Sequence, residues 1–316
     1  MGIETPPHVK FEIIRDMTRR DDNLLNISML CEVAGVSRSG YYRWLAAEPK
    51  REERESKDRA DFELILVAYR FRGYAKGGRG IYMRLLHQDP PVVMNLKKIR
   101  RLMHKYNLKC PIRKANPYRR MAKALRTSNV APNLLNREFR AHGPRKVLLT
   151  DITYLTYGFG QRSYLSTILD AYTKRILAYA LSDSLELDFV LETVTLLVQN
   201  HGVSLQAETL INSDQGVHYT SYRFIQLVKD CDLRQSMSRK ANCWDNAPQE
   251  SLFGHMKDEI DLVHCQIHGE VKSLIDDWID YYNNDRYQWD LAKLSPVEFE
   301  AYIHTGIYPL PTLKPQ

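Results

Sequence analysis

Three acidic residues lie in separate sequence settings that each suit a carboxylate with a chemical role. Asp151 follows the apolar run Val147–Leu149 and precedes further apolar residues, so we expect it within or at the end of a buried strand. Asp214 ends a second apolar run and leads into a turn. Glu250 comes shortly after Pro248, in a segment typical of the first turn of a helix.

If these elements converge, the three carboxylates would hold two Mg²⁺ ions about 3.5–4 Å apart, with Mn²⁺ as a substitute. One ion would activate a nucleophilic oxygen and the other would stabilise a leaving oxygen, which is phosphodiester chemistry. Each residue also has a structural alternative: Asp151 as a turn cap, Asp214 as the start of a turn and Glu250 as an exposed helix acid. Their joint occurrence favours the metal site.

The strings around the three acids resemble a known family. Asp214 and Glu250 are separated by 35 residues, the spacing associated with DDE recombinases that have a retroviral-integrase-like core. TDITY at 150–154, SDQG at 213–216 and DNAPQES at 245–251 resemble the second reading frame of the IS-three family of insertion-sequence transposases, as does the tail formed by Tyr282-Asn283, Arg286 and Leu294-Ser295-Pro296. The resemblance extends from Ser28 to Phe299. Leu148 replaces a usual Trp, and Gln288 replaces a frequent His.

That resemblance implies an α/β catalytic core of ribonuclease-H-like (integrase core) fold, preceded by all-α helix-turn-helix DNA-binding modules. It implies cleavage of DNA at the ends of a mobile element and strand transfer by the freed 3′-hydroxyl, without a covalent protein intermediate. The partners would be double-stranded DNA, as terminal inverted repeats and target, and further copies of the chain in a synaptic complex. Members of the family often act as a fusion with an upstream-frame helix-turn-helix protein.

The charge of the chain is strongly polarised. Residues 1–150 carry 32 Lys and Arg against 15 Asp and Glu, whereas residues 151–316 carry 13 against 23. Between Lys97 and Lys146 there are 16 basic residues and one acid, Glu138. This pattern indicates that the first half binds a polyanion, although a solvated basic face is the simpler alternative.

The segments before residue 147 predict helical DNA-binding modules. Asn26–Leu45 reads as helix, turn and helix, with Gly35 at the turn and Ser37 as N-cap, although an ordinary helical hairpin has the same pattern. We predict a helix-turn-helix region with a charged connecting helix at 1–60, a second module at 61–112 with helices near 81–86 and 95–106, and a basic linker at 113–146. The core would span 147–305 and the tail 306–316.

Several side chains are candidates for contact with DNA. Lys257 follows Glu250 by two helical turns and therefore shares its face, where it would hold a phosphate near the scissile bond. The alternatives are a surface lysine at this position and, for Arg286, a structural role. The other candidates are Arg38, Arg43, Lys97, Lys98, Arg101, Lys105, Arg113, Lys114, Arg119, Arg120, Asn242 and Trp244.

From Val147 the pattern predicts three strands, at 147–155, 163–169 and 175–181, then a helix at 188–200, a strand at 208–212, a helix at 221–230, a strand at 234–237 and the helix that carries Glu250. The order βββαβαβα is that of the ribonuclease-H-like fold. We interpret Asp170 as a turn carboxylate. Ser221 would cap a helix or, with Tyr219, position substrate.

The five cysteines are scattered without a CxxC pair, which argues against a disulfide framework or a structural zinc site, including one at His264, Cys265 and His268. We expect no signal peptide and no membrane span, and a bacterial cytoplasmic, nucleoid-associated location. Two rival functions stay open: a hydrolytic ribonuclease-H-like nuclease or resolvase, and a transposase-derived DNA-binding regulator without catalysis.

Overall fold

The computed structural model of the chain describes residues 5–20, 22–111, 142–205, 209–238 and 247–311. The chain divides into two compact units, Met1–Leu64 and Ile65–Gln316. The finer boundaries that we infer from sequence, at residues 60, 112, 146 and 305, stay predictions. Among the described residues, no helix is long and apolar enough to span a membrane.

The first unit is a small helical cluster that confirms the helix-turn-helix pattern. Helices α1 (Pro7–Thr18), α2 (Ile27–Val33) and α3 (Arg38–Ala46) pack around Ile14, Leu30, Cys31 and Tyr41. Gly35 turns the chain between α2 and α3 with a φ of +63°, a region that glycine enters without strain. The Ser37 hydroxyl accepts a hydrogen bond from the Gly40 N–H, as an N-cap should. Helix α1 was missing from the predicted elements.

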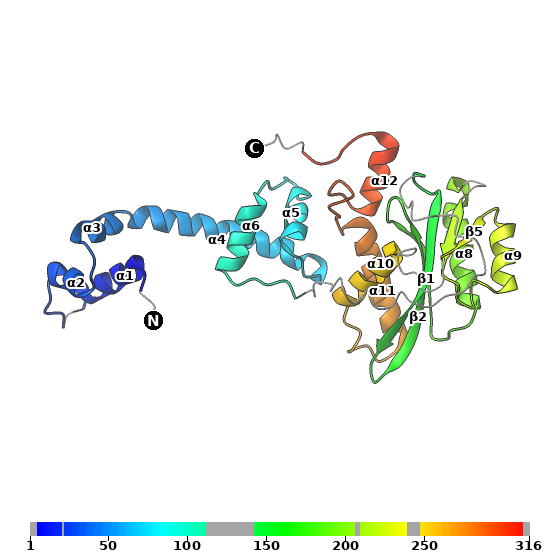
Figure 1. The fold of residues 1–316 in the computed structure, drawn as a ribbon, viewed down its shortest axis with the longest axis horizontal. Helices are drawn as coiled ribbons and strands as arrows, with labels where there is room; N and C mark the ends of the chain where they lie inside the picture. The colour runs from blue at the N-terminus through cyan, green and yellow to red at the C-terminus, as the bar shows by residue number, and fades with distance from the viewer. Residues whose placement is uncertain (1–4, 21, 112–141, 206–208, 239–246, 312–316) are drawn as a thin grey trace. The chain divides into compact units, whose positions relative to one another are not determined.

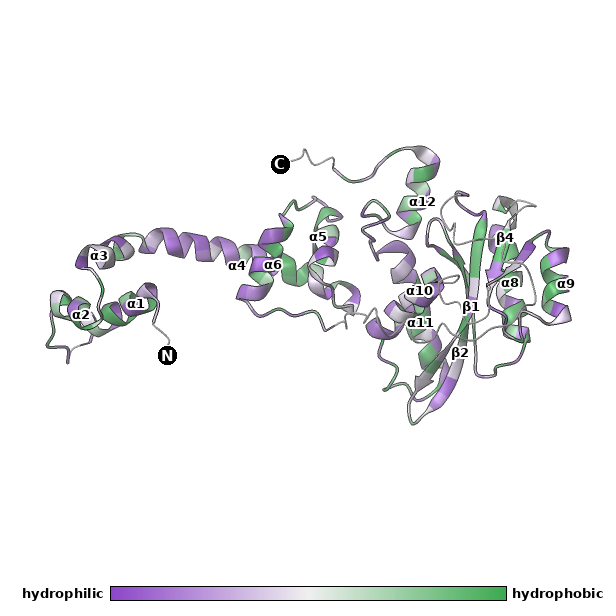
Figure 2. Ribbon diagram, viewed as in Figure 1, coloured by the Kyte–Doolittle hydropathy of each residue, from purple (hydrophilic) through white to green (hydrophobic). Residues whose placement is uncertain are grey.

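The charged connecting helix predicted within residues 1–60 is α4 (Glu48–Arg70), which extends beyond residue 60 and is largely hydrophilic in Figure 2. A 3-10 turn, η1 (Phe71–Gly73), precedes α5 (Gly78–Leu86) and α6 (Leu96–Lys105). These two helices contact each other and fully bury Ile81, Leu85, Ile99 and Leu102. Asn95 caps α6 by accepting the Lys97 N–H at 2.7 Å, so the start predicted there is confirmed.

The centre of the second unit is a five-stranded sheet of order β3-β2-β1-β4-β5. Its strands are β1 (Val147–Tyr157), β2 (Gln161–Asp170), β3 (Ile176–Ser182), β4 (Leu210–Ser213) and β5 (Arg234–Met237). β1, β2 and β3 pair antiparallel, whereas β4 is parallel to both β1 and β5. All five strands lie close to the predicted ranges.

Helices cover both faces of this sheet, as Figure 1 shows. α8 (Asp188–His201) and α9 (Tyr222–Asp230) lie on one face, and α10 (Ala247–Glu259) and α11 (His268–Asn284) on the other. Side chains alternate along β1, so Leu148 enters the core under α8 and α9 while Leu149 enters the core under α10 and α11. Leu148, which departs from the family pattern, is therefore a packing residue.

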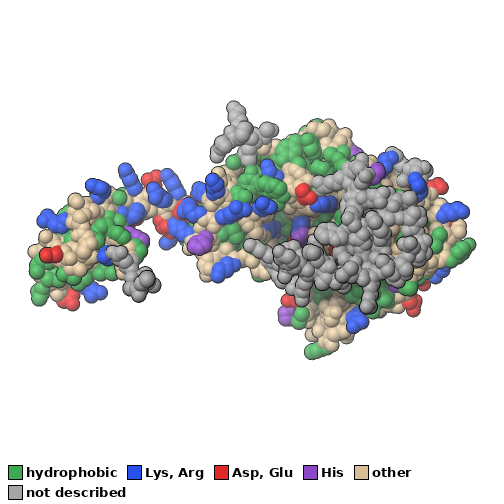
Figure 3. Space-filling model, in the orientation of Figure 1, with side chains coloured by type: hydrophobic (Ala, Val, Ile, Leu, Met, Phe, Trp, Pro, Cys, Tyr) green, Lys and Arg blue, Asp and Glu red, His purple; other side chains and the backbone are tan. Residues whose placement is uncertain are grey.

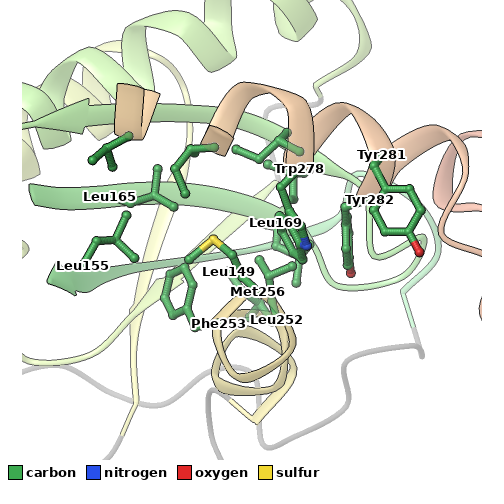
Figure 4. Packing of buried hydrophobic residues seen from close by; sticks show 14 of the residues in the cluster. Leu149, Leu155, Leu165, Leu169, Leu252, Phe253, Met256, Trp278, Tyr281 and Tyr282 are labelled. Carbon is green, nitrogen blue, oxygen red and sulfur yellow. The ribbon is translucent and has the colours of Figure 1, made fainter. Parts of the chain in front are cut away.

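The core under α10 and α11 determines where the catalytic candidates lie. Figure 4 shows Trp278 and Tyr282 of α11 and Leu252 and Met256 of α10 directed toward the leucines of β1 and β2. Trp278 is fully buried and donates its indole N–H to Glu259 at 3.0 Å. Both helices are thereby fixed to the sheet.

Two C-terminal helices were absent from the predicted elements. In α11, Val271, Ile275, Trp278, Ile279 and Tyr282 recur at helical spacing and are buried. In α12 (Pro296–Thr305), the tail motif itself is the helix start, because Ser295 is the N-cap and forms a capping box with Glu298, the third residue of the helix. Gln288, the second departure, donates to the Tyr282 hydroxyl at 3.3 Å and so also has a packing role.

Candidate active site

Asp151 and Asp214 lie side by side because their strands are adjacent and parallel. The β1–β4 pairing ends at Leu149 and Asn212, and Asp214 directly follows β4. The same register continued by two residues would bring Asp214 level with Asp151. Neighbouring strands are about 4.8 Å apart, and residues at equal register point to the same face. For both aspartates that face is the one covered by α10 and α11, since Leu149 and Leu210 share it.

Local hydrogen bonds hold each aspartate. Asp151 Oδ1 accepts the Ile152 N–H at 2.8 Å, and Asp214 Oδ1 accepts the Gly216 N–H at 2.8 Å across a tight turn. A Cβ at Gly216 would lie 2.9 Å from Asp214 Oδ1, closer than ordinary contact allows. The turn therefore needs glycine for Asp214 to keep this orientation.

Glu250 enters from the first turn of α10. Its neighbour Gln249 is fully buried and donates a hydrogen bond to the hydroxyl of Thr167, which lies directly opposite Asp151 in the β1–β2 pair. Glu250 itself is exposed at the helix surface. The buried amide of Gln249 thus brings the helix that carries Glu250 to the part of the sheet that carries Asp151.

The electrostatics of the site confirm that these residues are close to one another. Burial first, and then the charges of Asp214 and Glu250, raise the pKa of the Asp151 carboxyl to about 7, while the Ile152 N–H and the Lys257 ammonium oppose the rise. Burial lowers the pKa of Lys257, and Asp151 opposes that shift. The structure therefore gathers all four predicted side chains into one electrostatic neighbourhood.

The three carboxylates have the ligand chemistry that a divalent cation requires, but their side chains are not arranged around one point. In the described part of the chain, no three His, Cys, Asp or Glu side chains are already arranged to hold a metal ion. Yet burial, and then the charges of Asp214 and Glu250, raise the Asp151 pKa, and a cation would offset these effects; carboxylate oxygens are also the ligands that Mg²⁺ prefers. Asp151, Asp214 and Glu250 are the residues that would hold it.

Other acidic and hydroxyl candidates have structural roles. Asp170 is fully buried and accepts the Thr173 hydroxyl at 2.7 Å and the Tyr172 N–H at 3.1 Å, so it is the predicted turn carboxylate. Ser221 caps α9 by accepting the Phe224 N–H at 3.3 Å. Tyr219 is 1% exposed inside the core under α8 and α9, which leaves it no surface with which to position substrate.

The residues once considered for zinc have other surroundings. Cys265 is buried in the core under α10 and α11, and a ring nitrogen of His268 lies 3.0 Å from the Ser163 hydroxyl. The four cysteines in the described ranges, Cys31, Cys110, Cys231 and Cys265, are free thiols.

The proposed DNA contacts fall into three groups. Arg38 and Arg43 of α3 and Lys97, Arg101 and Lys105 of α6 are exposed, and Lys98 is half-buried. On the face that Figure 3 shows, many Lys and Arg side chains lie over the helices that precede the sheet. The remaining linker and loop candidates lie outside the described residues: Arg113, Lys114, Arg119, Arg120, Asn242 and Trp244.

Arg286 is largely buried, and its guanidinium donates to both carboxylate oxygens of Glu259, at 3.0 and 2.9 Å for the Oε1 contacts. This bidentate pair joins the end of α10 to the turn after α11. The geometry favours the structural alternative for Arg286, with the DNA contact left as a prediction.

A polar cluster that sequence did not reveal fixes the far end of the sheet. Glu300 of α12 is 7% exposed and pairs with Arg145, just before β1, at 2.6 Å, and with Arg175, just before β3. Partners 125 to 155 residues apart leave no local sequence signal.

Comparisons with known proteins agree with this arrangement. A family model described as an integrase core domain matches residues 141–243, and a second model of the same description matches residues 250–302. The first range contains Asp151 and Asp214, and the second begins at Glu250.

Three curated relatives align along most of the chain. The uncharacterized 31 kDa protein of insertion element IS600 from Shigella sonnei is 31% identical over 278 residues, covering 87% of this chain and 98% of that protein. The transposase for insertion sequence element IS904 from Lactococcus lactis is 30% identical, with coverages of 79% and 98%. Transposase InsF for insertion sequence IS3A from Escherichia coli is 27% identical, with coverages of 87% and 94%.

Proposed function

The chain belongs to the IS-three family of DDE insertion-sequence transposases, and from that premise we propose that it cuts DNA at the ends of an insertion sequence and joins the freed 3′-hydroxyl to a second phosphodiester. Its catalytic core has the ribonuclease-H-like fold, with strand order β3-β2-β1-β4-β5 and helices on both faces. Transposition by an integrase-like mechanism is the activity of such a core.

Asp151, Asp214 and Glu250 are the proposed ligands of two Mg²⁺ or Mn²⁺ ions. When bound, the ions supply an activated attacking oxygen and charge stabilisation at the leaving oxygen. The three carboxylates orient that chemistry because Asp151 lies in β1, Asp214 directly follows the adjacent strand β4, and Glu250 lies on a helix fixed to the same sheet. Rigid strands and a buried hydrogen bond hold such groups more accurately than loops do.

Lys257 is the proposed phosphate-holding residue. It lies two turns beyond Glu250 on α10, and its ammonium is within the electrostatic field of Asp151. A cation at this position would bind a non-bridging phosphate oxygen beside the scissile bond and so orient the phosphorus for in-line attack. Water would attack first and release a 3′-hydroxyl, which would then attack the second phosphodiester.

The helices of the first half are the proposed DNA-holding part. α3 follows the turn of a helix-turn-helix and exposes Arg38 and Arg43, which suits phosphates or base edges in the major groove. α6 exposes further basic side chains on its outer face. Their contacts would be mainly electrostatic and therefore weakened by salt.

Oligomeric assembly belongs to the same proposal. Joining two ends requires two terminal inverted repeats in one complex, and hence more than one copy of the chain. The alignments cover 94–98% of the three relatives reported above. A circular intermediate and an upstream-frame partner or fusion are proposed from family membership alone.

The observation that carries this proposal is that Asp151 of β1 and Asp214, just after the parallel strand β4, lie near enough for their charges to interact, with Glu250 on a helix bonded opposite Asp151. A test would select the preferred duplex from a random DNA pool and then offer the labelled duplex with Mg²⁺. The proposal requires both cleavage and joining. Cleavage without joining would indicate the nuclease or resolvase, and binding without cleavage would indicate the regulator.

A further inference from the structure

A cavity of about 270 Å³ lies in the second unit, where the start of α5 meets the ends of α10 and α11. It is far larger than the ~30 Å³ that one water occupies in the liquid. The rings of Tyr281 and Tyr287 form part of its wall. The charged and glycine residues around it are Lys76, Gly77, Arg79, Gly80, Glu259, Asp285 and Arg286.

Lys76 is the most buried cation at this cavity, at 7% exposure. Its ammonium donates to two neutral acceptors, the carbonyls of Phe71 and Tyr74, each at 2.7 Å. It also lies 5.3 Å from the centre of the Tyr281 ring. Among the described residues, no Asp or Glu pairs with this ammonium at salt-bridge distance. A buried charge that lacks a counterion is costly, and a bound anion would remove that cost.

The two acids of the cavity are already neutralised. Glu259 accepts two hydrogen bonds from the buried guanidinium of Arg286 and one from the Trp278 indole. Asp285 accepts a hydrogen bond from Arg72 at 2.7 Å and lies 3.9 Å from Arg84. The lining contains three cations, Lys76, Arg79 and Arg286, against these two acids, so its net charge is positive.

Backbone donors add to this positive charge. Helix α5 begins at Gly78, and its N-cap, Gly77, has no side chain to accept the first N–H groups of the helix. Uncapped N–H groups and the helix dipole favour an anion at this end. Arg79, on the first turn, is exposed and stacks over the Trp289 ring at 5.3 Å rather than pairing with a carboxylate.

The basic face of α6 adjoins the same helix start. A Cβ at Gly78 would lie 3.4 Å from Cγ of Arg100, so this exposed arginine of α6 packs against the first residue of α5. A basic side chain of α6 therefore adjoins the helix start that borders the cavity. This continuity favours a phosphate of a DNA backbone over a free anion.

We propose that the cavity at the start of α5 binds one DNA backbone phosphate through Lys76, Arg79 and the uncapped N–H groups of α5. The proposal rests on the proposed function in one respect, namely that the chain binds duplex DNA. It adds a specific anion site, away from the metal-binding carboxylates, between the α5–α6 helices and the catalytic core.

Two variants of the full-length chain test the site from opposite directions. Gly77→Ser supplies the missing cap in open space, since a Cβ there meets no atom within 4 Å, and should raise the thermal midpoint of the DNA-free protein. The same hydroxyl would occupy the N–H donors and weaken DNA binding. Arg79→Gln should reduce the slope of log affinity against log salt by up to about 0.9, the value for one phosphate.

Arg223→Gln is the matched control. Arg223 is the second residue of α9 as Arg79 is of α5, but α9 has Ser221 as its cap and Arg223 pairs with Asp188 at 2.9 Å. This control should leave the salt slope at the wild-type value. A Gly77→Ser protein that melts higher and binds duplex DNA as tightly as wild type would overturn the site, as would equal slopes for Arg79→Gln and Arg223→Gln.

The outcomes also separate this proposal from the one it rests on. If the wild-type chain fails to bind duplex DNA, the proposed function fails with it. If wild type binds and both cavity variants match the control, the phosphate site alone fails. If inorganic phosphate at constant ionic strength raises the thermal midpoint of wild type but not of Arg79→Gln, while DNA affinity is unchanged in both, the cavity takes a free anion and the DNA assignment is wrong.

Discussion

Gln249 donates a hydrogen bond to the hydroxyl of Thr167, and Thr167 is the residue directly opposite Asp151 across the β1–β2 pair. Both side chains are buried, with 0% and 1% exposure. Because Gln249 precedes Glu250, this bond connects the third acid of the triad with the strand pair that carries the first. Polar pairs inside a core restrict an interface to one alignment more strongly than apolar packing does.

Removing one partner of this hydrogen bond should lower the free energy of unfolding more than replacing both partners. Thr167→Val leaves the Gln249 amide buried without its acceptor, which should lower the free energy of unfolding by about 1–3 kcal/mol. The double variant Thr167→Val/Gln249→Leu replaces both partners by apolar groups and should recover most of that loss, yet strand joining should stay reduced because Glu250 is less well positioned. Urea unfolding and joining assays on the same proteins would measure both effects. Additive losses in the double variant would contradict the coupling.

The three acids should be required for cleavage and joining of DNA but not for DNA binding. Asp151→Asn, Asp214→Asn and Glu250→Gln should each abolish cleavage and joining, because each removes an oxygen charge that holds the metal, while affinity for duplex DNA stays close to wild type. Asp277→Asn, an exposed acid on α11, is the control that should keep full activity. Normal joining by any triad variant, measured with labelled end DNA and Mg²⁺, would remove that residue from the site.

Sequence patterns found most of the elements that have local signals, although α12 was missed, and they did not reveal contacts between distant partners. Gly35 and Ser37 predict the helix-turn-helix because a turn and an N-cap are decided within a few residues. The capping box of Ser295 and Glu298 was equally local, and α12 was predictable from it. The partners Gln249 and Thr167 are 82 residues apart, so only the folded sheet reveals their contact.

In the candidate site, too, sequence motifs identify the residues, whereas only the folded structure shows where they lie. The identities of Asp151, Asp214 and Glu250 follow from motifs, whereas the nearness of the two aspartates follows from the pairing of β1 with β4. Burial of Arg286 and Lys76 was not predictable, because arginine and lysine are usually exposed and only their tertiary partners make burial tolerable. Burial is what favours the structural pair with Glu259 over the DNA contact for Arg286.

The charge of Lys76 gives the cavity a pH dependence. Burial lowers the pKa of Lys76 from 10.5 to about 8, so the folded chain loses this charge near pH 8 while the unfolded chain keeps it to about 10.5. In that window the unfolded state binds more protons, and this group's contribution to stability rises with pH. The charged groups that face the ammonium are Glu259, Arg84, Asp285 and Arg286.

DNA binding should change in the opposite direction. Between pH 7 and 9 the Lys76 ammonium is lost, so the salt slope of duplex binding should fall by up to about 0.9. Lys76→Met should show the lower slope at both pH values, if the variant folds as judged by circular dichroism. A wild-type slope that is the same at pH 7 and pH 9 would count against a role for this ammonium.

The first helix-turn-helix should contribute independently of the cavity. Arg38→Gln/Arg43→Gln removes two exposed charges from α3 and should reduce the salt slope by roughly two phosphate contacts, about 1.8. Lys57→Gln/Arg59→Gln is the control on α4, because those charges already pair with Glu53 and Glu55 at i,i+4 spacing. Equal slopes for the two double variants, measured on one duplex by fluorescence anisotropy, would refute DNA contact by α3.

The last prediction concerns Lys257, two turns beyond Glu250 on α10 and opposed in charge to Asp151. Lys257→Ala should remove one charge-assisted hydrogen bond to phosphate, about 1.5–3 kcal/mol, so end cleavage should fall roughly 10- to 150-fold while general DNA affinity changes little. Lys257→Arg should restore part of the rate. The control is Lys229→Ala, which changes an exposed lysine of α9 on the other face of the sheet and should leave cleavage normal. If Lys257→Ala cleaved ends at the wild-type rate under limiting DNA, Lys257 would be an ordinary surface lysine and the substrate face of α10 would lie elsewhere.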